Sequence, residues 1–127
     1  MDKQLYETGL KTRREVLGDA YVDRSLAAAT QLTQPLQDLL NEYCWGAVWS
    51  RPGLDRRSRS LVNLGMITAL GKGPELKIHI HGALRNGLSQ EEIVEVLLQT
   101  AIYCGMPAAL EAFRVAKEVF SEEGLPA

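Results

Sequence analysis

Apolar residues recur along most of this chain with the period of an α-helix. Between positions 36 and 48 they fall three or four residues apart, at Leu36, Leu39, Leu40, Tyr43, Cys44, Ala47 and Val48. This spacing is typical of one face of an amphipathic helix. Thr33 precedes the run as a candidate N-cap, and Pro35 lies in its first turn. Pro52 and Gly53 then end the pattern, because the residue before a proline avoids the helical region.

The second half of the chain predicts four more helices. Asp55 is a candidate N-cap, and the segment 61–70 that follows is apolar on nearly every side, so we expect a central, buried helix. Gly71 and Gly73 end it. Pro74 suits the start of the next helix, which runs to about Asn86 with Gly87 after its end.

The last two predicted helices have equally clear starts. Ser89-Gln90-Glu91-Glu92 forms a capping box, in which Ser89 accepts from a helix amide and Glu92 reaches back. Pro107 begins the final helix, which ends before Gly124 and whose expected stripe is Leu110, Phe113, Lys117 and Phe120.

The N-terminal third is more polar but still helical in pattern. Residues 3–17 predict a helix closed by Gly18, and a short helical piece is expected near 23–29. No internal repeat, linker or low-complexity tract interrupts the chain. We therefore predict a single all-α domain of about six helices spanning residues 1–127.

Composition narrows the class of protein. The 127 residues are 46% hydrophobic and carry a net charge of −2, which is typical of a folded domain and unlike a basic nucleic-acid-binding protein. The stretch 96–110, the longest one poor in charge, is shorter than the roughly 20 apolar residues of a membrane span. Neither an export signal nor a disulfide framework is evident, so we expect a cytoplasmic protein that interacts with neither membranes nor nucleic acids.

Glu75 and His79 are the first candidate pair for chemistry. On a helix starting at Pro74 they lie four residues apart and share a face. A carboxylate one turn before an imidazole can orient it and hold up its pKa, which suits proton transfer near neutral pH. The alternative is an exposed i,i+4 pair with no catalytic role.

His81 lies on a different side of the same helix from His79, so the two cannot share a site within one subunit. We expect it to pair with Arg85, one turn later, as a second polar face or a subunit contact. No third and fourth ligand appears at suitable spacing, and we expect neither a metal nor an organic cofactor.

Trp45, Trp49 and Arg51 stand where a helix gives way to the Pro52-Gly53 loop. The two indoles are i,i+4 neighbours, which indicates core or interface packing more often than a ligand platform. Arg51 is the better candidate for binding a carboxylate, through its planar fork of donors. Cys44 and Cys104 have apolar neighbours and are expected to be buried and structural.

Three groups of residues together resemble the carboxymuconolactone decarboxylase family, and they span nearly the whole chain. The first group is 42–46 with 49–54 and 59–61, the second is 75–79 with 82–87, and the third runs from 91–93 to 107–109. The most specific feature is the motif from Trp45-Gly46 to Leu54 together with the later segment Glu75-Leu76-Lys77-Ile78-His79. The resemblance implies the all-helical alkylhydroperoxidase D-like fold, assembled as a homotrimer or, more typically, a homohexamer.

The resemblance also bears on which chemistry is available. The peroxidase branch of that superfamily carries a Cys-x-x-Cys pair, a histidine three residues later and a glutamate on the preceding helix. Lys72 and Glu75 stand where the cysteines belong, and about Ser60 where the glutamate belongs, so only His79 matches. Thiol peroxidase chemistry lacks its nucleophile, although a peroxiredoxin label is often extended to the whole family.

The namesake reaction is the decarboxylation of a carboxylated unsaturated lactone in the catabolism of aromatic compounds, the β-ketoadipate type of pathway. It needs no cofactor, because the substrate itself accepts the electrons left by CO₂. On this basis we assign the proton donor to His79, oriented by Glu75, with Glu42 as a further acid–base candidate. The candidate substrate-binding residues are Arg51, Arg85, Trp45 and His81.

Two alternative functions, from classes other than the decarboxylases, stay open. One is a thiol-dependent peroxidase that uses Cys44 or Cys104. The other is a non-catalytic oligomeric binding protein that kept the fold and lost the site.

Overall fold

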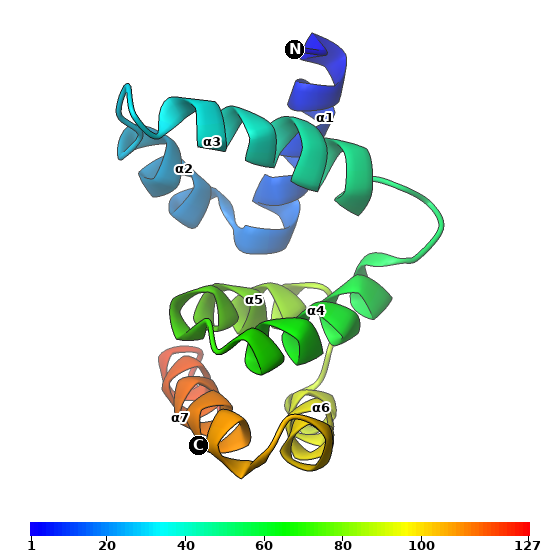
Figure 1. The fold of residues 1–127 in the computed structure, drawn as a ribbon, viewed down its shortest axis with the longest axis vertical. Helices are drawn as coiled ribbons and strands as arrows, with labels where there is room; N and C mark the ends of the chain where they lie inside the picture. The colour runs from blue at the N-terminus through cyan, green and yellow to red at the C-terminus, as the bar shows by residue number, and fades with distance from the viewer. The chain divides into compact units, whose positions relative to one another are not determined.

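The computed structural model describes all residues from Met1 to Ala127 and contains helices only. Seven α-helices and one π-helical segment are present, against about six helices predicted (Figure 1). The chain divides into two compact units, Met1–Arg56 and Arg57–Ala127, and each is described by itself.

The N-terminal unit contains α1 (Lys3–Leu17), α2 (Asp19–Ala27), α3 (Gln34–Leu39) and η1 (Leu40–Trp49). The bounds of α1 are those predicted, and Gly18 after it has a φ of 89° that favours glycine. The predicted helix that begins after Thr33 exists, but its last ten residues form a wider π-helix. The Thr33 side chain does not cap this helix; its hydroxyl instead accepts from the backbone N–H of Thr30.

Two glycines let α1 and η1 pack with their backbones in close contact. A Cβ atom on Gly9 would lie 1.7 Å from the carbonyl oxygen of Asn41, and one on Gly46 would lie 2.4 Å from that of Leu5. Because carbonyl groups in a helix cannot move aside, only glycine fits at these two positions.

A buried arginine ties the same helices together. Arg13 on α1 is only 3% exposed and donates to Gln37 Oε1, Asn41 Oδ1 and Ser25 Oγ at 2.9, 3.0 and 3.2 Å. All three acceptors are neutral, and burial lowers the pKa of the guanidinium. Arg13 therefore joins α1 to α2, α3 and η1 without a carboxylate partner.

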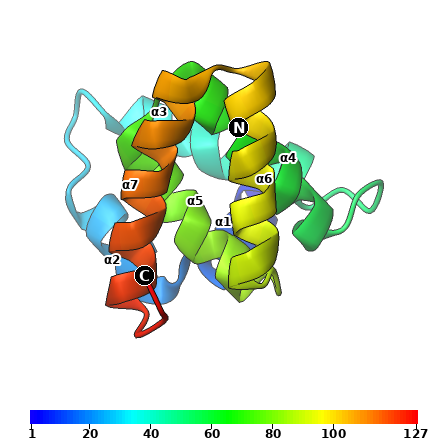
Figure 2. The same ribbon diagram turned by 90° about the horizontal axis from the view of Figure 1, so that it is seen from below.

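The C-terminal unit is built from α4 (Arg56–Leu70, whose first residue belongs to the other unit), α5 (Gly73–Arg85), α6 (Gln90–Tyr103) and α7 (Met106–Glu122). The capping box of Ser89 and Glu92 is confirmed at the start of α6. Seen from below, α6 and α7 lie side by side as a hairpin (Figure 2). The core of this unit is apolar: Leu64, Leu76, Ile80, Ala83, Leu88, Ile93, Leu97, Ala112, Val115, Ala116, Val119 and Phe120.

One prediction about buried faces was wrong and a second was half right. The segment 61–70 is not buried all round: Val62, Met66 and Leu70 are 51, 52 and 70% exposed, and Leu64 faces the core. Of the stripe predicted on α7, Phe120 is buried and Phe113 packs against the core, whereas Leu110 is 57% exposed and Lys117 is exposed. Smaller residues of α7, such as Ala112 and Ala116, also face the core, because they let α5 and α6 approach closely.

None of the helices combines the length and the apolar character that a membrane crossing requires.

Candidate active site

His79 lies on the side of α5 that faces α4. Its Nδ1 is 3.1 Å from Nδ2 of Asn63, and the ring is half-buried. With the Asn63 amide as donor, Nδ1 accepts, and the neutral ring carries its hydrogen on Nε2. Sequence reasoning missed Asn63, although it is the one amide in the otherwise apolar segment 61–70.

A second hydrogen bond continues this contact between α4 and α5. Asn86, two turns after His79, donates through Nδ2 to Ser60 Oγ at 2.8 Å. Ser60 and Asn63 are three residues apart on α4, so the two bonds lie in sequence along one helix–helix contact. Together they fix the rotation of α5 and hence the orientation of His79.

The charge state of His79 differs from the prediction. Burial lowers the pKa of His79 to about 4, and the opposing effect of Glu75 is smaller. Glu75 is exposed and shares the helix face as expected, but the ring nitrogen Nδ1 has Asn63 as its partner. The expectation that Glu75 holds the pKa near neutrality is therefore wrong, and His79 is neutral at pH 7 in the free protein.

His81 and Arg85 do not pair. His81 Nδ1 lies 2.6 Å from Glu123 and Nε2 lies 3.1 Å from Glu122, both near the end of α7. Arg85 is exposed in the last turn of α5. His81 thus joins α5 to the end of α7 through the two carboxylates.

The other candidates lie in the N-terminal unit. The carboxylate of Glu42, near the start of η1, is buried and accepts the backbone N–H of Asp2 at 2.8 Å. Trp45 and Trp49 stack with centroids 4.8 Å apart, at an angle of 25°. Both indoles are buried, an arrangement typical of packing, and substrate binding by Trp45 stays a prediction.

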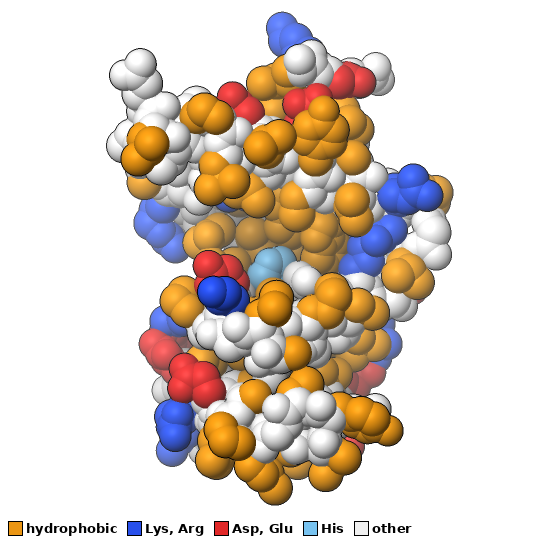
Figure 3. All heavy atoms as spheres, in the orientation of Figure 1, with side chains coloured by type: hydrophobic (Ala, Val, Ile, Leu, Met, Phe, Trp, Pro, Cys, Tyr) orange, Lys and Arg blue, Asp and Glu red, His pale blue; other side chains and the backbone are white.

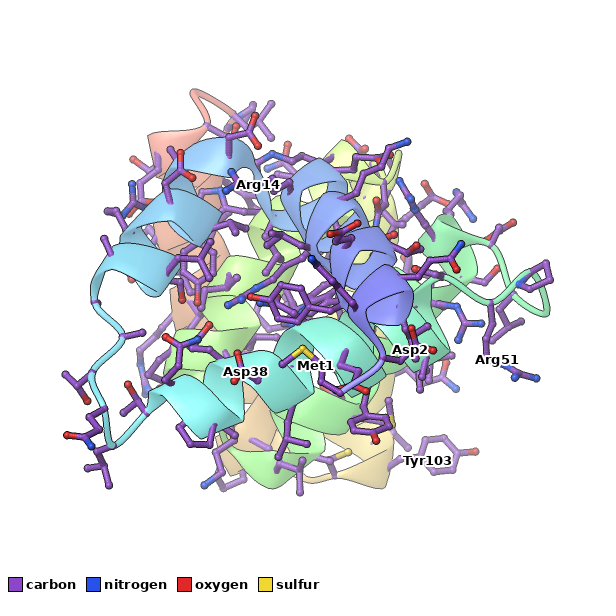
Figure 4. All side chains as sticks on the ribbon, turned by 90° about the horizontal axis from the view of Figure 1, so that it is seen from above. Met1, Asp2, Arg14, Asp38, Arg51 and Tyr103 are labelled. Carbon is purple, nitrogen blue, oxygen red and sulfur yellow. The ribbon has the colours of Figure 1, made fainter.

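Arg51 follows the end of η1 in a loop anchored by hydroxyl groups. Ser50 Oγ donates to the carbonyl of Trp45 at 2.7 Å and is 2.9 Å from Thr12 Oγ1. Arg51 itself is exposed and projects from this loop (Figure 4). It lines an open groove of about 520 Å³ whose lining also includes the cations Lys11 and Arg56 and the carboxylates Glu15 and Asp55. Arg56 pairs with Glu15 at 2.9 Å.

The two cysteines have different surroundings. Cys44 is half-buried, and burial raises the pKa of its thiol although Arg13 opposes the shift. Cys104 is exposed after the end of α6, so the expectation that both are buried was wrong for Cys104. Neither residue lies in an environment shown to favour the reactive thiolate.

No group of three or more His, Cys, Asp or Glu side chains is arranged to hold a metal ion. The candidates divide between the units: Glu75, His79, His81 and Arg85 belong to the C-terminal unit, and Glu42, Trp45 and Arg51 to the N-terminal unit. The best-defined chemical group within one unit is the neutral, hydrogen-bonded imidazole of His79.

Comparison with known proteins adds the family. The model of the carboxymuconolactone decarboxylase family matches residues 34–118, about two thirds of the chain. The chain belongs to the carboxymuconolactone decarboxylase family.

Near-full-length relatives agree with this assignment. Nitrosuccinic acid decarboxylase of Metarhizium robertsii is 43% identical over 122 residues, which are 96% of this chain and 85% of the relative. The 4-carboxymuconolactone decarboxylase of Acinetobacter baylyi is 41% identical over 124 residues, 98% of this chain and 92% of the relative. An uncharacterised 15.0 kDa protein of Paracoccus denitrificans is 28% identical over 123 residues, 95% and 91% of the two chains.

The relationship to two decarboxylases over almost the whole chain identifies the protein as an enzyme of the carbon–carbon lyase class, a decarboxylase. These relationships favour the decarboxylase hypothesis over the two alternatives, a thiol-dependent peroxidase and a non-catalytic binding protein.

Proposed function

We propose that this enzyme decarboxylates a small carboxylic acid in which the carbanion left by the loss of CO₂ is conjugated to an electron-accepting group. The first candidate substrate is 4-carboxymuconolactone, whose breakdown belongs to the catabolism of aromatic compounds. Nitrosuccinic acid is the second candidate, because the relative named for it is as similar to this chain as the one named for the lactone.

The two candidate substrates share their chemistry. When CO₂ leaves, the electron pair of the broken carbon–carbon bond moves into the unsaturated lactone of one or the nitro group of the other. No cofactor is needed as an electron sink. A proton must then be added at carbon, so the protein has to bind a carboxylate and supply one proton in each turnover.

His79 is the proposed proton donor. In the free protein it is neutral, because burial lowers the pKa of its ring to about 4. A bound anion beside the ring favours its charged form, so we expect substrate binding to be accompanied by uptake of one proton from solvent. The imidazolium then gives its Nε2 proton to the substrate carbon and returns to the neutral form, with the proton taken up on binding retained on the ring.

The hydrogen bond from Asn63 supports this role. It occupies Nδ1 and leaves the proton of the neutral ring on Nε2, which points away from Asn63. When the ring becomes charged, the second proton is added at Nδ1, where the Asn63 amide turns to accept it through Oδ1, and the Nε2 proton is the one given to the substrate. Glu75 contributes by favouring the charged ring, the smaller of the two effects on the pKa of His79. Arg51, exposed beside its groove, is proposed as a carboxylate-binding residue and is to be tested separately from His79.

The observation that carries the proposal is the half-buried, neutral imidazole held by an amide in a chain related to two decarboxylases. The test is to incubate purified protein with each acid in turn and to measure CO₂ release together with the ultraviolet absorbance. We expect turnover of at least one acid, with one CO₂ released per substrate consumed. Absence of CO₂ from both acids would contradict the proposed substrate class.

A further inference from the structure

An open groove of about 640 Å³ runs between α4 and α6 within the C-terminal unit. Four residues of α4 and six of α6 line it, and none of them belongs to the candidate site around His79. Hydrophobic side chains are exposed over much of this unit, which occupies the lower part of Figure 3. The groove is thus a feature of one unit that the proposed decarboxylation does not use.

The α4 wall of the groove is apolar and has free space beside it. Val62 and Met66 lie one helical turn apart in this wall and are 51 and 52% exposed. Gly65 also lines the groove, and a Cβ atom at this position would meet no atom within 4 Å. A ligand can therefore approach the backbone of α4 closely and cover both apolar side chains.

The α6 wall carries two carboxylates without partners. Glu91 and Glu95 line the groove one turn apart, both are exposed, and none of the ion pairs of the structure uses either. The carboxylate of Glu92 instead pairs with Arg57 and completes the capping box. The helix dipole stabilises an acid in the first turn, such as Glu91, but Glu95 lies beyond that turn. Because no Lys or Arg lines the groove, both charges are uncompensated there.

The size of the groove favours a small molecule over a protein partner. Pockets for small molecules have volumes of about 300–1,000 Å³. A stable protein interface, in contrast, involves about 20–30 residues on each side. Ten residues line this groove, so its volume and extent match those of a small-molecule site.

We propose that the groove binds an amphipathic organic cation, an amine with an aliphatic body. The body packs against Val62 and Met66 beside Gly65, and the ammonium group lies between Glu91 and Glu95. Charge complementarity selects the cation, since a carboxylate in the same place is repelled by both glutamates. An aliphatic body suits a lining that contains no aromatic side chain. This inference does not rest on the decarboxylase activity.

A titration with octylamine tests the proposal, with octanoate and 1-octanol as the anionic and neutral compounds of the same length. The chain has three methionines, so labelling their methyl groups with ¹³C gives a simple spectrum. Met66 lines the groove, whereas Met106 on α7 does not and reports non-specific effects. We expect octylamine to shift the Met66 resonance to saturation and leave Met106 unchanged. It should bind roughly 10-fold or more tightly than octanoate.

Two variants separate the charges from the free space. Glu91→Gln combined with Glu95→Gln should weaken octylamine binding roughly 5–30-fold, because two exposed ion pairs are lost. Gly65→Leu fills the open space and should weaken binding by about 10-fold or more, while α4 stays helical because leucine favours a helix more than glycine does. The control combines Glu7→Gln with Asp38→Asn, which removes two charges from the N-terminal unit and should bind as wild type. Circular dichroism checks that each variant is folded.

Three results would each overturn the proposal. The first is equal binding of octylamine, octanoate and 1-octanol, or no shift of Met66 with octylamine. The second is an unchanged octylamine affinity in the folded variant without Glu91 and Glu95. The third is a Met66 resonance that moves when the protein is diluted but not when octylamine is added, since another copy of the chain would then cover the groove.

Discussion

Nδ2 of Asn63 lies 3.1 Å from Nδ1 of His79 and joins α4 to α5 at the one imidazole whose pKa is strongly lowered. The bond defines which ring nitrogen is available for proton transfer. It therefore connects a side chain inside an apolar helix to the chemistry proposed for the enzyme.

Asn63→Ala should release His79 to adopt either neutral tautomer. We expect kcat to fall by about 10-fold, as for other residues that orient a catalytic group, with a smaller change in KM. Nitrogen chemical shifts of the imidazole report the tautomer directly. Asn86→Ala is the matched control, because it removes the neighbouring bond between α5 and α4, the one to Ser60, and keeps the bond between Asn63 and His79. Equal tautomer shifts in both variants would mean that Asn63 has no special role.

The stability of the protein should depend on pH through His79. Burial lowers its pKa from 6.5 to about 4, so between these values the unfolded chain binds a proton that the folded chain does not. This contribution is fully present above pH 6.5 and is lost as the pH falls towards 4.

His79→Gln removes that dependence. Allowing for the half-exposed ring, we expect the free energy of unfolding of wild type to drop by roughly 1–2 kcal/mol more than that of the variant between pH 6.5 and 4. Urea unfolding at a series of pH values measures the difference. Parallel curves for the two proteins would show that the pKa of His79 is not lowered by folding.

Glycine at position 9 should be essential for packing. Gly9→Ala places a methyl group against the carbonyl oxygen of Asn41, so we expect a loss of about 2–4 kcal/mol in the free energy of unfolding despite the better helix propensity of alanine. Gly65→Ala in α4 is the control, since nothing lies within 4 Å of its Cβ position. It should instead gain about 0.5–1 kcal/mol. Thermal unfolding of both variants measures the two effects, and a Gly9→Ala protein as stable as wild type would contradict the packing argument.

Replacement of both cysteines by serine should leave kcat within about an order of magnitude of wild type, allowing for packing losses around half-buried Cys44. The raised pKa of the Cys44 thiol disfavours the nucleophilic form that peroxidase chemistry requires. The same assay with a peroxide substrate should give no thiol-dependent turnover. Loss of all decarboxylation in a folded double variant would restore the thiol hypothesis.

Local signals predicted most of the helices well. Gly18, Gly87 and the Ser89–Glu92 capping box act on their own neighbours, so the sequence around them determines the ends of α1, α5 and the start of α6. The close approach of Gly9 and Gly46 was not predictable in this way, because it joins two helices far apart in the sequence. No local signal of the sequence pointed to the π-helical segment either.

The site was predicted less completely, because contacts between helices far apart in the sequence leave no local signal. His79 and Glu75 could be placed on one helix face from their spacing, but the partner of the ring, Asn63, lies on another helix. The balance between burial and the charge of Glu75 also depends on packing, which reversed the expected direction of the pKa. That residues 1–127 form one domain remains a prediction.

The proton-donor role of His79 is the central claim, and the kcat of His79→Gln with the acid that wild type decarboxylates tests it most directly. Glutamine keeps a polar side chain of similar length but cannot carry the catalytic proton. We predict a decrease in kcat of roughly 10²–10⁴, with a much smaller change in KM and an unchanged circular dichroism spectrum. A kcat within about three-fold of wild type, in a folded variant, would contradict the account and turn attention to Glu42.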